Sequence, residues 1–366
     1  MSKNHYIIPI FVPHKGCPFD CIFCNQKKIT GVQGDISASQ VVKTIEEYIK
    51  TISNKDADIE VAFYGGSFTG IPIQLQKKLL EAVQPFKNRN IIHHIRLSTR
   101  PDYIDINILK FLKEFNVTII ELGVQSMDDE VLTLSCRGHN REDVIKAASM
   151  IRESGFTLGL QMMIGLPGDT VKKMYYTANE IIKLKPDMVR IYPALVIKDT
   201  ELEYLYRMDR YKPLELKAAV QICKKLLILF ETNSIQVIRI GLQATETITQ
   251  GKDVIAGPFH PAFRELVESE IKLDMLEWGI RQFSEIPHEL EIHVNPKAVS
   301  EVVAVKKKNI KYLKNKFKFS KITIIQDMEL KRDEMIVKHG IESCNISKKN
   351  FFNTIKNRRN FIANIE

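Results

Sequence analysis

The sequence predicts an α/β fold: a partial barrel of six β/α units followed by a smaller α+β appendage. Two observations support this expectation. Short runs rich in Ile, Val, Leu, Phe and Tyr alternate six times with amphipathic stretches before Pro193, which is typical of parallel strands joined by right-handed helical crossovers. Six units are fewer than the eight of a closed barrel, so we expect the barrel to be open on one side.

The elements of this first part follow in a regular order. The expected strands cover residues 6–12, 59–64, 95–99, 118–123, 157–164 and 188–192, and the helices between them cover residues 38–51, 73–86, 103–115, 141–154 and 170–184. A capping or turn residue stands near the start of several helices, at Ser37, Asp102, Asn140 and Asp169, and Gly155 follows one helix as a stop. In folds of this kind the chemistry collects at the carboxyl ends of the strands.

The pattern changes after Pro193. A helix at 214–230 and a short strand at 235–240 are expected first, and an irregular stretch with Gly251, Gly257, Pro258 and Pro261 follows. A second unit then begins with a helix at 262–282, a strand at 289–294, a Lys-rich helix at 299–317 and a strand at 321–326. We therefore expect a core domain of residues 1–240 and a basic C-terminal accessory domain of residues 241–366.

The composition is that of an ordinary globular protein. The chain has 366 residues, of which 44% are hydrophobic and 27% are charged, so it can bury a large core, and disorder is excluded over most of its length. No apolar run reaches the roughly 18 residues that a membrane span needs. The first apolar run is broken by Pro9 and followed by Pro13, unlike a signal peptide. We expect a cytoplasmic protein that does not associate with membranes.

The positive charge is concentrated at the C-terminal end. The net charge is +9, and residues 301–366 hold 16 Lys plus Arg against 7 Asp plus Glu, so the first 300 residues are neutral overall. One interpretation is a Lys-rich solvated face. The other is an appendage that binds a polyanion and is attached to a neutral catalytic body.

Three of the six cysteines fall within eight residues. Cys17, Cys21 and Cys24 form a C-x3-C-x2-C pattern directly after the first expected strand. Three thiolates at this spacing can hold three irons of a [4Fe–4S] cluster and leave the fourth iron without a protein ligand. A structural zinc site, with His14 as a fourth ligand, is the alternative. The remaining cysteines, Cys136, Cys223 and Cys344, are scattered along the chain and expected to be inert.

With this motif, and with Phe23 just before its last cysteine, the chain resembles the radical S-adenosylmethionine (SAM) superfamily. The resemblance implies that Cys17, Cys21 and Cys24 bind a [4Fe–4S] cluster whose open iron is chelated by the amino and carboxylate groups of SAM. Reduction of the cluster would then split SAM into methionine and a 5′-deoxyadenosyl radical, which abstracts a hydrogen atom. The cofactors carry the chemistry, while the protein binds and orients the reactants.

Further segments at the expected strand ends carry the same resemblance. They are Phe63-Tyr64-Gly65-Gly66-Ser67-Phe68, Glu121-Leu122-Gly123-Val124-Gln125-Ser126, Arg137-Gly138-His139 and Gln161-Met162-Met163-Ile164-Gly165-Leu166-Pro167-Gly168. The resemblance implies SAM contacts from the glycine turn, whose backbone can approach a ligand closely, and from polar side chains beside it. The implied cofactor-binding residues are Phe23, Gly65, Gly66, Ser67, Gln125, Arg137 and Gln161. No residue is assigned to the chemistry on the final substrate.

Within the superfamily, the chain most resembles the radical SAM half of the Elongator catalytic subunit. The shared segments are residues 65–68, 98–103, 121–126, 137–139, 192–200 and 210–213. This resemblance implies tRNA wobble-uridine modification, tRNA binding through the basic C-terminal region, and a flavodoxin or ferredoxin as electron donor. Only about 125 residues follow the core, without a clear acyl-CoA loop, so no acetyltransferase domain is evident.

Two alternatives remain open. Oxygen-independent coproporphyrinogen oxidase shares the Gly-Val-Gln-Ser and Gly-Leu-Pro-Gly segments but carries a further Cys where Gln26 stands, and it would imply a tetrapyrrole or another small molecule as substrate. An RNA-binding protein with a structural or redox-sensing cluster is the alternative of another class. The run Lys306-Lys307-Lys308-Asn309-Ile310-Lys311, with Tyr312 and Phe317 nearby, would then contact phosphates.

Overall fold

The structure is a computed structural model that describes residues 4–12, 21–25, 36–54, 56–242, 249 and 251–357. The chain forms two compact units. Unit 1 comprises Met1–Leu216 with Ile235–Pro261, and unit 2 comprises Lys217–Ser234 with Ala262–Glu366. The domain boundary expected after residue 240 thus lies within the second stretch of unit 1. The reason is that β9 (Val254–Ala256) pairs antiparallel with β7 (Val196–Ile197), while helix α10 (Leu216–Thr232) packs into unit 2.

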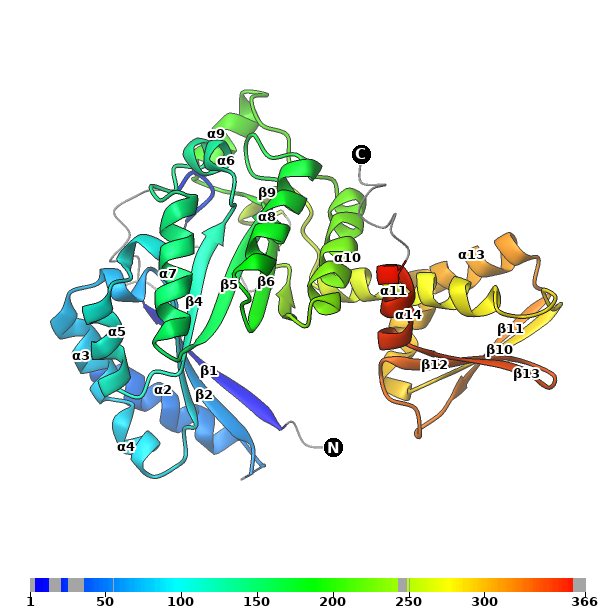
Figure 1. The fold of residues 1–366 in the computed structure, drawn as a ribbon, viewed down its shortest axis with the longest axis horizontal. Helices are drawn as coiled ribbons and strands as arrows, with labels where there is room; N and C mark the ends of the chain where they lie inside the picture. The colour runs from blue at the N-terminus through cyan, green and yellow to red at the C-terminus, as the bar shows by residue number, and fades with distance from the viewer. Residues whose placement is uncertain are drawn as a thin grey trace. The chain divides into compact units, whose positions relative to one another are not determined.

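Unit 1 is built on one parallel sheet that forms a partial barrel (Figure 1). Its seven strands follow the order β1-β2-β3-β4-β5-β6-β8. They are β1 (His5–Val12), β2 (Asp58–Gly65), β3 (His94–Thr99), β4 (Ile119–Gln125), β5 (Thr157–Ile164), β6 (Met188–Pro193) and β8 (Gln236–Ile240). The predicted α/β partial barrel is confirmed, and the short strand expected at 235–240 extends it beyond β6.

The connecting helices of unit 1 are α2 (Ala38–Thr51), α3 (Ile73–Glu81), α4 (Gln84–Asn88), α5 (Ile106–Glu114), α6 (Asp129–Leu134), α7 (Arg141–Glu153), α8 (Val171–Lys183) and α9 (Glu201–Arg207). Five helices were expected between the first six strands of unit 1; the one expected at 73–86 is divided into α3 and α4, and α6 and α9 were not expected. The helix expected at 103–115 was placed too early, because Asp105 is the N-cap that accepts from the N–H groups of Asn107 and Ile108. No helix of the described residues is long and apolar enough to cross a membrane.

The two faces of the sheet differ in chemistry. Successive strand residues point to opposite faces, and on β2 the residues Ile59, Val61 and Phe63 are buried and apolar. The other face carries buried charges, namely Glu60, Arg96, Glu121 and Arg190, each 8% exposed or less. Both faces of a parallel sheet are usually apolar. This sheet departs from that rule, because one of its faces carries a set of buried, paired charges.

Unit 2 has a four-stranded sheet in the order β11-β10-β12-β13. Its strands are β10 (Glu289–Val294), β11 (Lys321–Gln326), β12 (Glu334–His339) and β13 (Glu342–Ser347), and its helices are α10, α11 (Phe263–Ile280), α12 (Val299–Val303), α13 (Lys308–Phe317) and α14 (Lys348–Asn357). Gly279 of α11 lies against the sheet so closely that a Cβ there would sit 2.2 Å from Ile346 Cδ1. This contact explains the glycine inside a helix.

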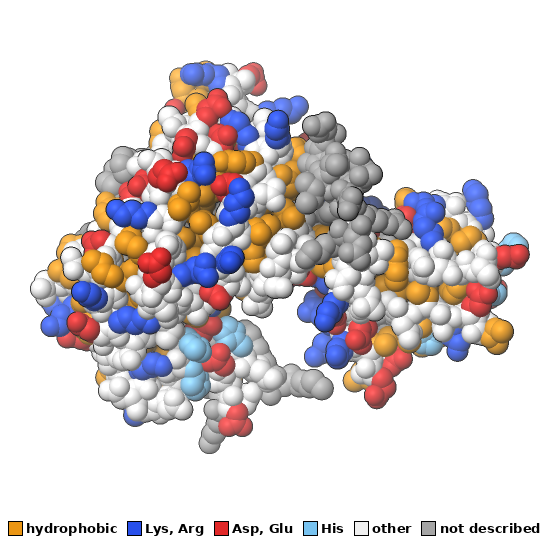
Figure 2. All heavy atoms as spheres, in the orientation of Figure 1, with side chains coloured by type: hydrophobic (Ala, Val, Ile, Leu, Met, Phe, Trp, Pro, Cys, Tyr) orange, Lys and Arg blue, Asp and Glu red, His pale blue; other side chains and the backbone are white. Residues whose placement is uncertain are grey.

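The prediction of a single Lys-rich helix at 299–317 is wrong. The backbone has positive φ at Ala304, Lys306 and Lys307, so the segment divides into α12, a short 3-10 turn and α13. The sequence of this segment contains no Gly or Pro that would predict the break. Lys and Arg side chains lie exposed around α13 (Figure 2).

Candidate functional site

The cysteine loop follows the carboxyl end of β1, as predicted. Cys17 lies outside the described residues, whereas Cys21 is buried and Cys24 is half-buried. The segment is held by its backbone: the N–H of Ile22 donates to Ser135 O at 3.4 Å, and the N–H of Leu202 donates to Ile22 O at 2.8 Å. The two described thiols are therefore fixed against the end of α6 and the start of α9.

Phe23 packs this loop onto the barrel. Its ring lies partly buried between two apolar clusters, one formed by Ile22, Val196, Leu202 and Tyr211 and the other by Val131, Leu166 and Ala194. This packing removes part of the Phe23 ring from water and holds the segment against the barrel. The contact with SAM expected for Phe23 stays a prediction.

The Gly65-Gly66-Ser67 turn lies directly against the start of the cysteine loop. Gly65 has φ +108°, and a Cβ there would lie 2.4 Å from Val12 O. The N–H of Gly66 donates to the same carbonyl at 3.2 Å. The close approach therefore requires glycine at position 65, while position 66 supplies a hydrogen bond.

Ser67 connects this turn to the end of β3. Its hydroxyl lies 2.8 Å from the Thr99 hydroxyl and accepts from the N–H of Arg100 at 3.2 Å. The side chain is almost completely buried. In this structure Ser67 positions two strand ends, and its predicted cofactor contact stays a prediction.

Arg137 is the residue that joins the cysteine loop to the strand ends. Its Nη1 donates to Cys21 Sγ at 3.2 Å, and its Nη2 donates to Gly123 O at 2.8 Å. The side chain is buried, and its Nε has no partner within the part of the chain that the structure describes. Arg137 thus places a buried positive charge in contact with a sulfur of the cysteine motif.

A second arginine fixes the backbone of the first. Arg100 Nη2 donates to Arg137 O at 2.5 Å. The same guanidinium binds Asp102 with two hydrogen bonds of 2.9 Å. The segment 98–103 was singled out in the sequence, but this supporting role was not foreseen, because residues 100 and 137 meet only in the fold.

The two predicted glutamines meet beside Arg137. Gln125 ends β4 with φ +67°, after a register shift that begins at Gly123. Gln161 Nε2 lies 3.5 Å from Gln125 Oε1. A Cβ at Gly123 would lie 3.0 Å from Gln125 Nε2 and 3.3 Å from Arg137 Nη2. A residue without a side chain at position 123 therefore leaves room for the side chains of Gln125 and Arg137.

His139 is a buried histidine that the sequence did not single out as functional. Its Nε2 lies 3.2 Å from Val124 O, which can only accept, so Nε2 carries the proton. Burial, together with the charges of Arg137 and Arg100, lowers the pKa of His139 to about 3. The ring is therefore neutral at physiological pH.

The inner face of the barrel holds a connected network of charges. Glu121 accepts from Arg96 at 2.5 Å and from Arg190 at 2.5 and 2.9 Å. Arg96 also binds Glu60 at 2.7 and 3.1 Å, and Arg190 Nη2 lies 2.9 Å from the Tyr64 hydroxyl. Burial alone would raise the pKa of Glu121, but the two arginines outweigh it and hold this pKa below its usual value. Two carboxylates thus balance two guanidiniums.

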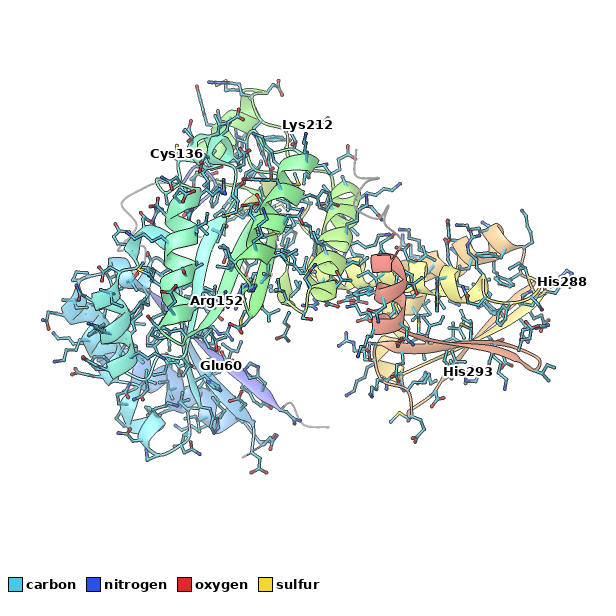
Figure 3. The ribbon with its side chains drawn as sticks, in the orientation of Figure 1. Glu60, Cys136, Arg152, Lys212, His288 and His293 are labelled. Atoms are coloured by element: carbon cyan, nitrogen blue, oxygen red, sulfur yellow. The ribbon has the colours of Figure 1, made fainter. Side chains whose placement is uncertain are left out.

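Sequence reasoning missed this network as a functional feature. The signal was present, because Glu60, Arg96, Glu121 and Arg190 interrupt strands that are otherwise apolar. Burial raises the pKa of Tyr64 to about 12, with Glu121 adding to the effect. The network lines the sheet below the cysteine end. Figure 3 shows Cys136, the neighbour of Arg137, and Glu60 toward opposite ends of the sheet.

The three cysteines expected to be inert lie in different surroundings. Cys136 is exposed and has φ +51°. Cys223 is buried in α10, and burial raises its pKa well above the usual range. Burial also raises the pKa of Cys344 on β13. A raised pKa keeps a thiol protonated and poorly suited to metal binding.

Comparison with known proteins identifies the family. The family model described as the Radical SAM superfamily matches residues 11–181, and the one described as the Radical_SAM C-terminal domain matches residues 186–273. The chain belongs to the radical SAM superfamily. It is thereby an enzyme of that superfamily, and the resemblance inferred from the motifs is confirmed.

Radical SAM relatives of two kinds match this chain. A tRNA uridine(34) acetyltransferase of Methanocaldococcus jannaschii is 29% identical over 256 residues, which are 59% of this chain and 47% of that protein. The heme chaperone HemW of Bacillus subtilis is 27% identical over 201 residues, or 53% of this chain and 52% of that protein. The chain therefore spans about half the length of these curated relatives.

A solved structure shows the same radical SAM fold. It is the archaeal Methanocaldococcus infernus Elp3 with an N-terminal deletion, with a TM-score of 0.61 and 24% sequence identity. The match covers 75% of this chain and 64% of that one. At this level of identity the likeness establishes the fold, and the site must be argued from the residues themselves.

Proposed function

We propose that this protein binds a [4Fe–4S] cluster at Cys17, Cys21 and Cys24, binds SAM at the adjoining strand ends, and uses them to modify tRNA. The observation that carries the proposal is the position of Arg137. Its guanidinium joins the sulfur of Cys21 to the backbone of Gly123, at the end of the barrel where the glycine turn and both glutamines also lie.

The chemistry of these residues fits an anionic cluster and a ligand with a carboxylate. Arg137 Nε is a buried donor for which the described residues provide no acceptor, and such a group costs roughly 1–3 kcal/mol until it is satisfied. A carboxylate is the acceptor that guanidinium groups bind best. Gly65 and Gly123 leave the backbone bare beside it.

Each group of this chain then has a task. A cluster bound here would supply the electron for reductive cleavage of SAM. Cys21 and Cys24 would hold iron, and the Arg137 guanidinium would orient the carboxylate of the ligand. Phe23 would hold the cysteine loop against the barrel. The balanced Glu121–Arg190 pair gives the inner face fixed hydrogen-bonding groups that orient a polar substrate.

A tRNA substrate is supported by the acetyltransferase relative and by the lysines of unit 2. Lys308 forms an ion pair with Glu270 at 2.7 Å, and Lys316 forms one with Glu277 at 2.7 Å. Lys306, Lys307 and Lys311 are exposed, and the described residues give them no ion pair. We assign the phosphate contacts to these three lysines. A flavodoxin or ferredoxin is proposed as the electron donor.

The test is substrate-stimulated cleavage of SAM. Anaerobically reconstituted protein is incubated with SAM, dithionite and bulk tRNA at low salt, and 5′-deoxyadenosine is quantified while digested tRNA is analysed by mass spectrometry. The proposal predicts faster 5′-deoxyadenosine release with tRNA and a mass change in one nucleoside. If tRNA neither binds nor changes the rate, the tRNA assignment is wrong.

A tetrapyrrole is the second candidate substrate, favoured by the similarity to the heme chaperone HemW. It is tested in the same assay with a porphyrin in place of tRNA. Tight porphyrin binding by protein that ignores tRNA would favour this function. A porphyrin has few carboxylates, so its binding would depend only weakly on salt.

A further inference from the structure

A cluster of imidazoles and carboxylates lies at the amino ends of β1, β2 and β3. It contains His5 on β1, Asp58 and Glu60 on β2, and His93 and His94 at the start of β3. Figure 2 shows histidine side chains gathered with acidic ones on this surface of unit 1. Because β1 runs from His5 to Val12, roughly 23 Å separates the cluster from the cysteine end of the strand.

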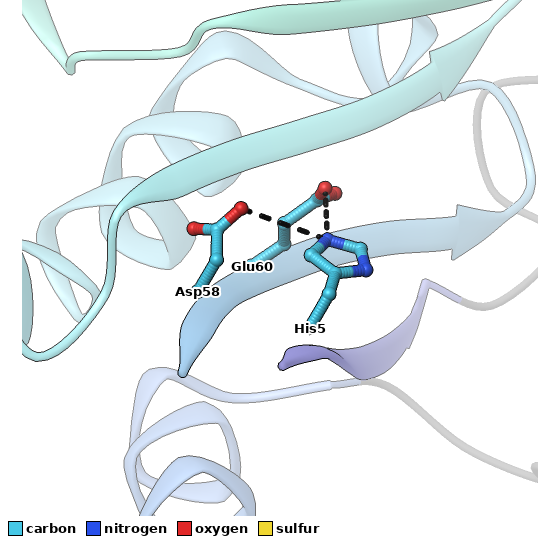
Figure 4. A group of neighbouring side chains, drawn as sticks. All are labelled: His5, Asp58 and Glu60. Carbon is cyan, nitrogen blue, oxygen red and sulfur yellow. Dashed lines mark hydrogen bonds and ion pairs between the residues drawn. The ribbon is translucent and has the colours of Figure 1, made fainter. Parts of the chain in front are cut away.

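Three of these residues can reach a single ion. One ligand atom each of His5, Asp58 and Glu60 lies within 4.8 Å of the other two (Figure 4). His5 Nε2 is 2.6 Å from Glu60 Oε1 and 3.9 Å from Asp58 Oδ2. Neighbouring ligand atoms of a tetrahedral zinc site are roughly 3.3–3.6 Å apart, so small side-chain rotations suffice.

His94 lies beside the carboxylate of Asp58, with its Nε2 3.8 Å from Asp58 Oδ1. Its Nδ1 is 3.3 Å from Thr118 Oγ1, and that hydroxyl is also 3.3 Å from Ile95 O. When the hydroxyl donates to Ile95 O, His94 Nδ1 donates to the hydroxyl, and Nε2 of the neutral ring carries the lone pair that can bind an ion. A ligand imidazole is commonly oriented through its other nitrogen in this way.

His93 differs from its neighbour although it also lies near Asp58. Its Nδ1 accepts from the N–H of Ile59 at 3.1 Å, so the lone pair on that nitrogen is already used. His93 Nδ1 is 3.4 Å from Asp58 Oδ1. We therefore exclude it from the ligand set, and it provides a control within the same cluster.

The charge around Asp58 favours a divalent cation. Its ion-pair partners in the described part of the chain are imidazoles alone, with no Lys or Arg within 4.0 Å. The side chains of His5 and Asp58 are each 45% exposed, so an ion can enter from solvent. Glu60 is held by two hydrogen bonds from Arg96, which fix the orientation of its carboxylate.

We propose that His5, Asp58, Glu60 and His94 form a site for a divalent transition-metal ion of the zinc class, separate from the iron–sulfur cluster. Imidazole nitrogen with carboxylate oxygen is a ligand set that zinc accepts. The ion takes the place of the hydrogen bond between His5 Nε2 and Glu60. The neutral His5 ring then carries its one proton on Nδ1 and binds the ion through the lone pair of Nε2. The ion ties the N-terminal strand to β2 and β3, at the end of the barrel remote from the radical chemistry.

The test uses Zn²⁺ as the probe on protein that carries its reconstituted cluster. The protein is dialysed to equilibrium against about 10 µM Zn²⁺, a concentration above the dissociation constant of a site that binds in the low micromolar range. The zinc and iron bound per chain are then measured separately by mass spectrometry. We expect one zinc per chain in the wild type and none in His5→Ala or Asp58→Asn, with iron unchanged. His93→Ala should keep the zinc, and so should His288→Ala, a change at an exposed histidine of unit 2.

A second measurement distinguishes the loss of a zinc ligand from the loss of zinc through misfolding. With Co²⁺ as the probe, visible d–d absorption should appear in the wild type and in His93→Ala and should disappear in His5→Ala, whose far-UV circular dichroism stays native. Zinc absent from the wild type, or held equally by His5→Ala and Asp58→Asn, would overturn the site.

Discussion

Arg137 donates a hydrogen bond to the sulfur of Cys21 at 3.2 Å, although 116 positions separate the two residues in sequence. The contact joins the loop after β1 to the turn after α6. It also places a permanent positive charge beside a sulfur of the cysteine motif. Arg137 is therefore part of the proposed cluster site as well as of the proposed SAM site.

Removing this guanidinium should weaken the chemistry strongly. A hydrogen bond to a charged group contributes about 1.5–3 kcal/mol, so Arg137→Ala should slow SAM cleavage by roughly 10- to 100-fold. Release of 5′-deoxyadenosine by the reconstituted, reduced protein measures the effect. Arg152→Ala is the control, because this exposed arginine donates to Leu184 O at 3.1 Å and has no other hydrogen bond among the described residues. Cleavage at the wild-type rate by Arg137→Ala would contradict this role.

The glycine turn should tolerate no side chain at position 65. A Cβ there meets Val12 O at 2.4 Å, so Gly65→Ala must displace the end of β1 and, with it, the cysteine loop. We expect a loss of about 1–3 kcal/mol in the free energy of unfolding and loss of SAM cleavage. Gly66→Val should suppress cleavage too.

A matched control separates strain from displacement at this turn. Gly251 also has positive φ, at +83°, but a Cβ there would meet no atom of the described residues within 4 Å. Gly251→Ala should thus cost backbone strain alone and leave SAM cleavage intact. Equal loss of activity in both variants would mean that the contact with Val12 does not matter.

The neutral His139 should make stability depend on pH. Its pKa is lowered from 6.5 to about 3 in the folded protein, so the unfolded chain binds more protons between these values. Stability from this group is complete above about pH 6.5 and falls as the pH drops, by at most about 1.4 kcal/mol per unit. Urea unfolding of cluster-free protein from pH 7.5 to 5 should show a shallower decline for His139→Gln. Parallel curves would exclude the effect.

Binding of tRNA should depend on particular lysines of unit 2. Changing Lys306, Lys307 and Lys311 together to Ala should weaken binding and flatten the log–log salt slope by about two to three. Changing Lys308 and Lys316 should have less effect, because these two already pair with Glu270 and Glu277. Fluorescence anisotropy with labelled tRNA at several salt concentrations measures both. An unchanged slope in the triple variant would remove these lysines from the interface.

Point variants are preferable to deletion of residues 301–366. The strands β11, β12 and β13 lie in this segment and complete the sheet around β10. Gly279 of α11 packs against Ile346 of β13. A truncated protein would expose this core and lose tRNA binding through unfolding, whatever the lysines do.

The sequence predicted the barrel because each strand is a compact apolar run between helical patterns. It did not predict β12 and β13, since residues such as Glu342, Ser343 and Asn345 give little apolar alternation. It placed the lysines of 299–317 on one helix because nothing in the residue types signals positive φ at Lys306 and Lys307. Such backbone conformations are set by tertiary packing.

The candidate site could be predicted only as separate motifs. Cys21, Gly65, Gln125 and Arg137 were each identified from their segments, but which of them touch depends on the fold. The Arg137–Cys21 contact and the support of Arg137 by Arg100 come from residues distant in sequence. Charges inside apolar strands were the one overlooked signal for the inner-face network.

The iron content and SAM cleavage of the cysteine variants test the central claim most directly. Anaerobic reconstitution should give about four irons per wild-type chain and release of 5′-deoxyadenosine on reduction. Cys17→Ala, Cys21→Ala and Cys24→Ala should each abolish both, whereas Cys136→Ala, Cys223→Ala and Cys344→Ala should retain both. A wild-type protein that binds zinc through these three cysteines, holds no iron and leaves SAM intact would contradict the account.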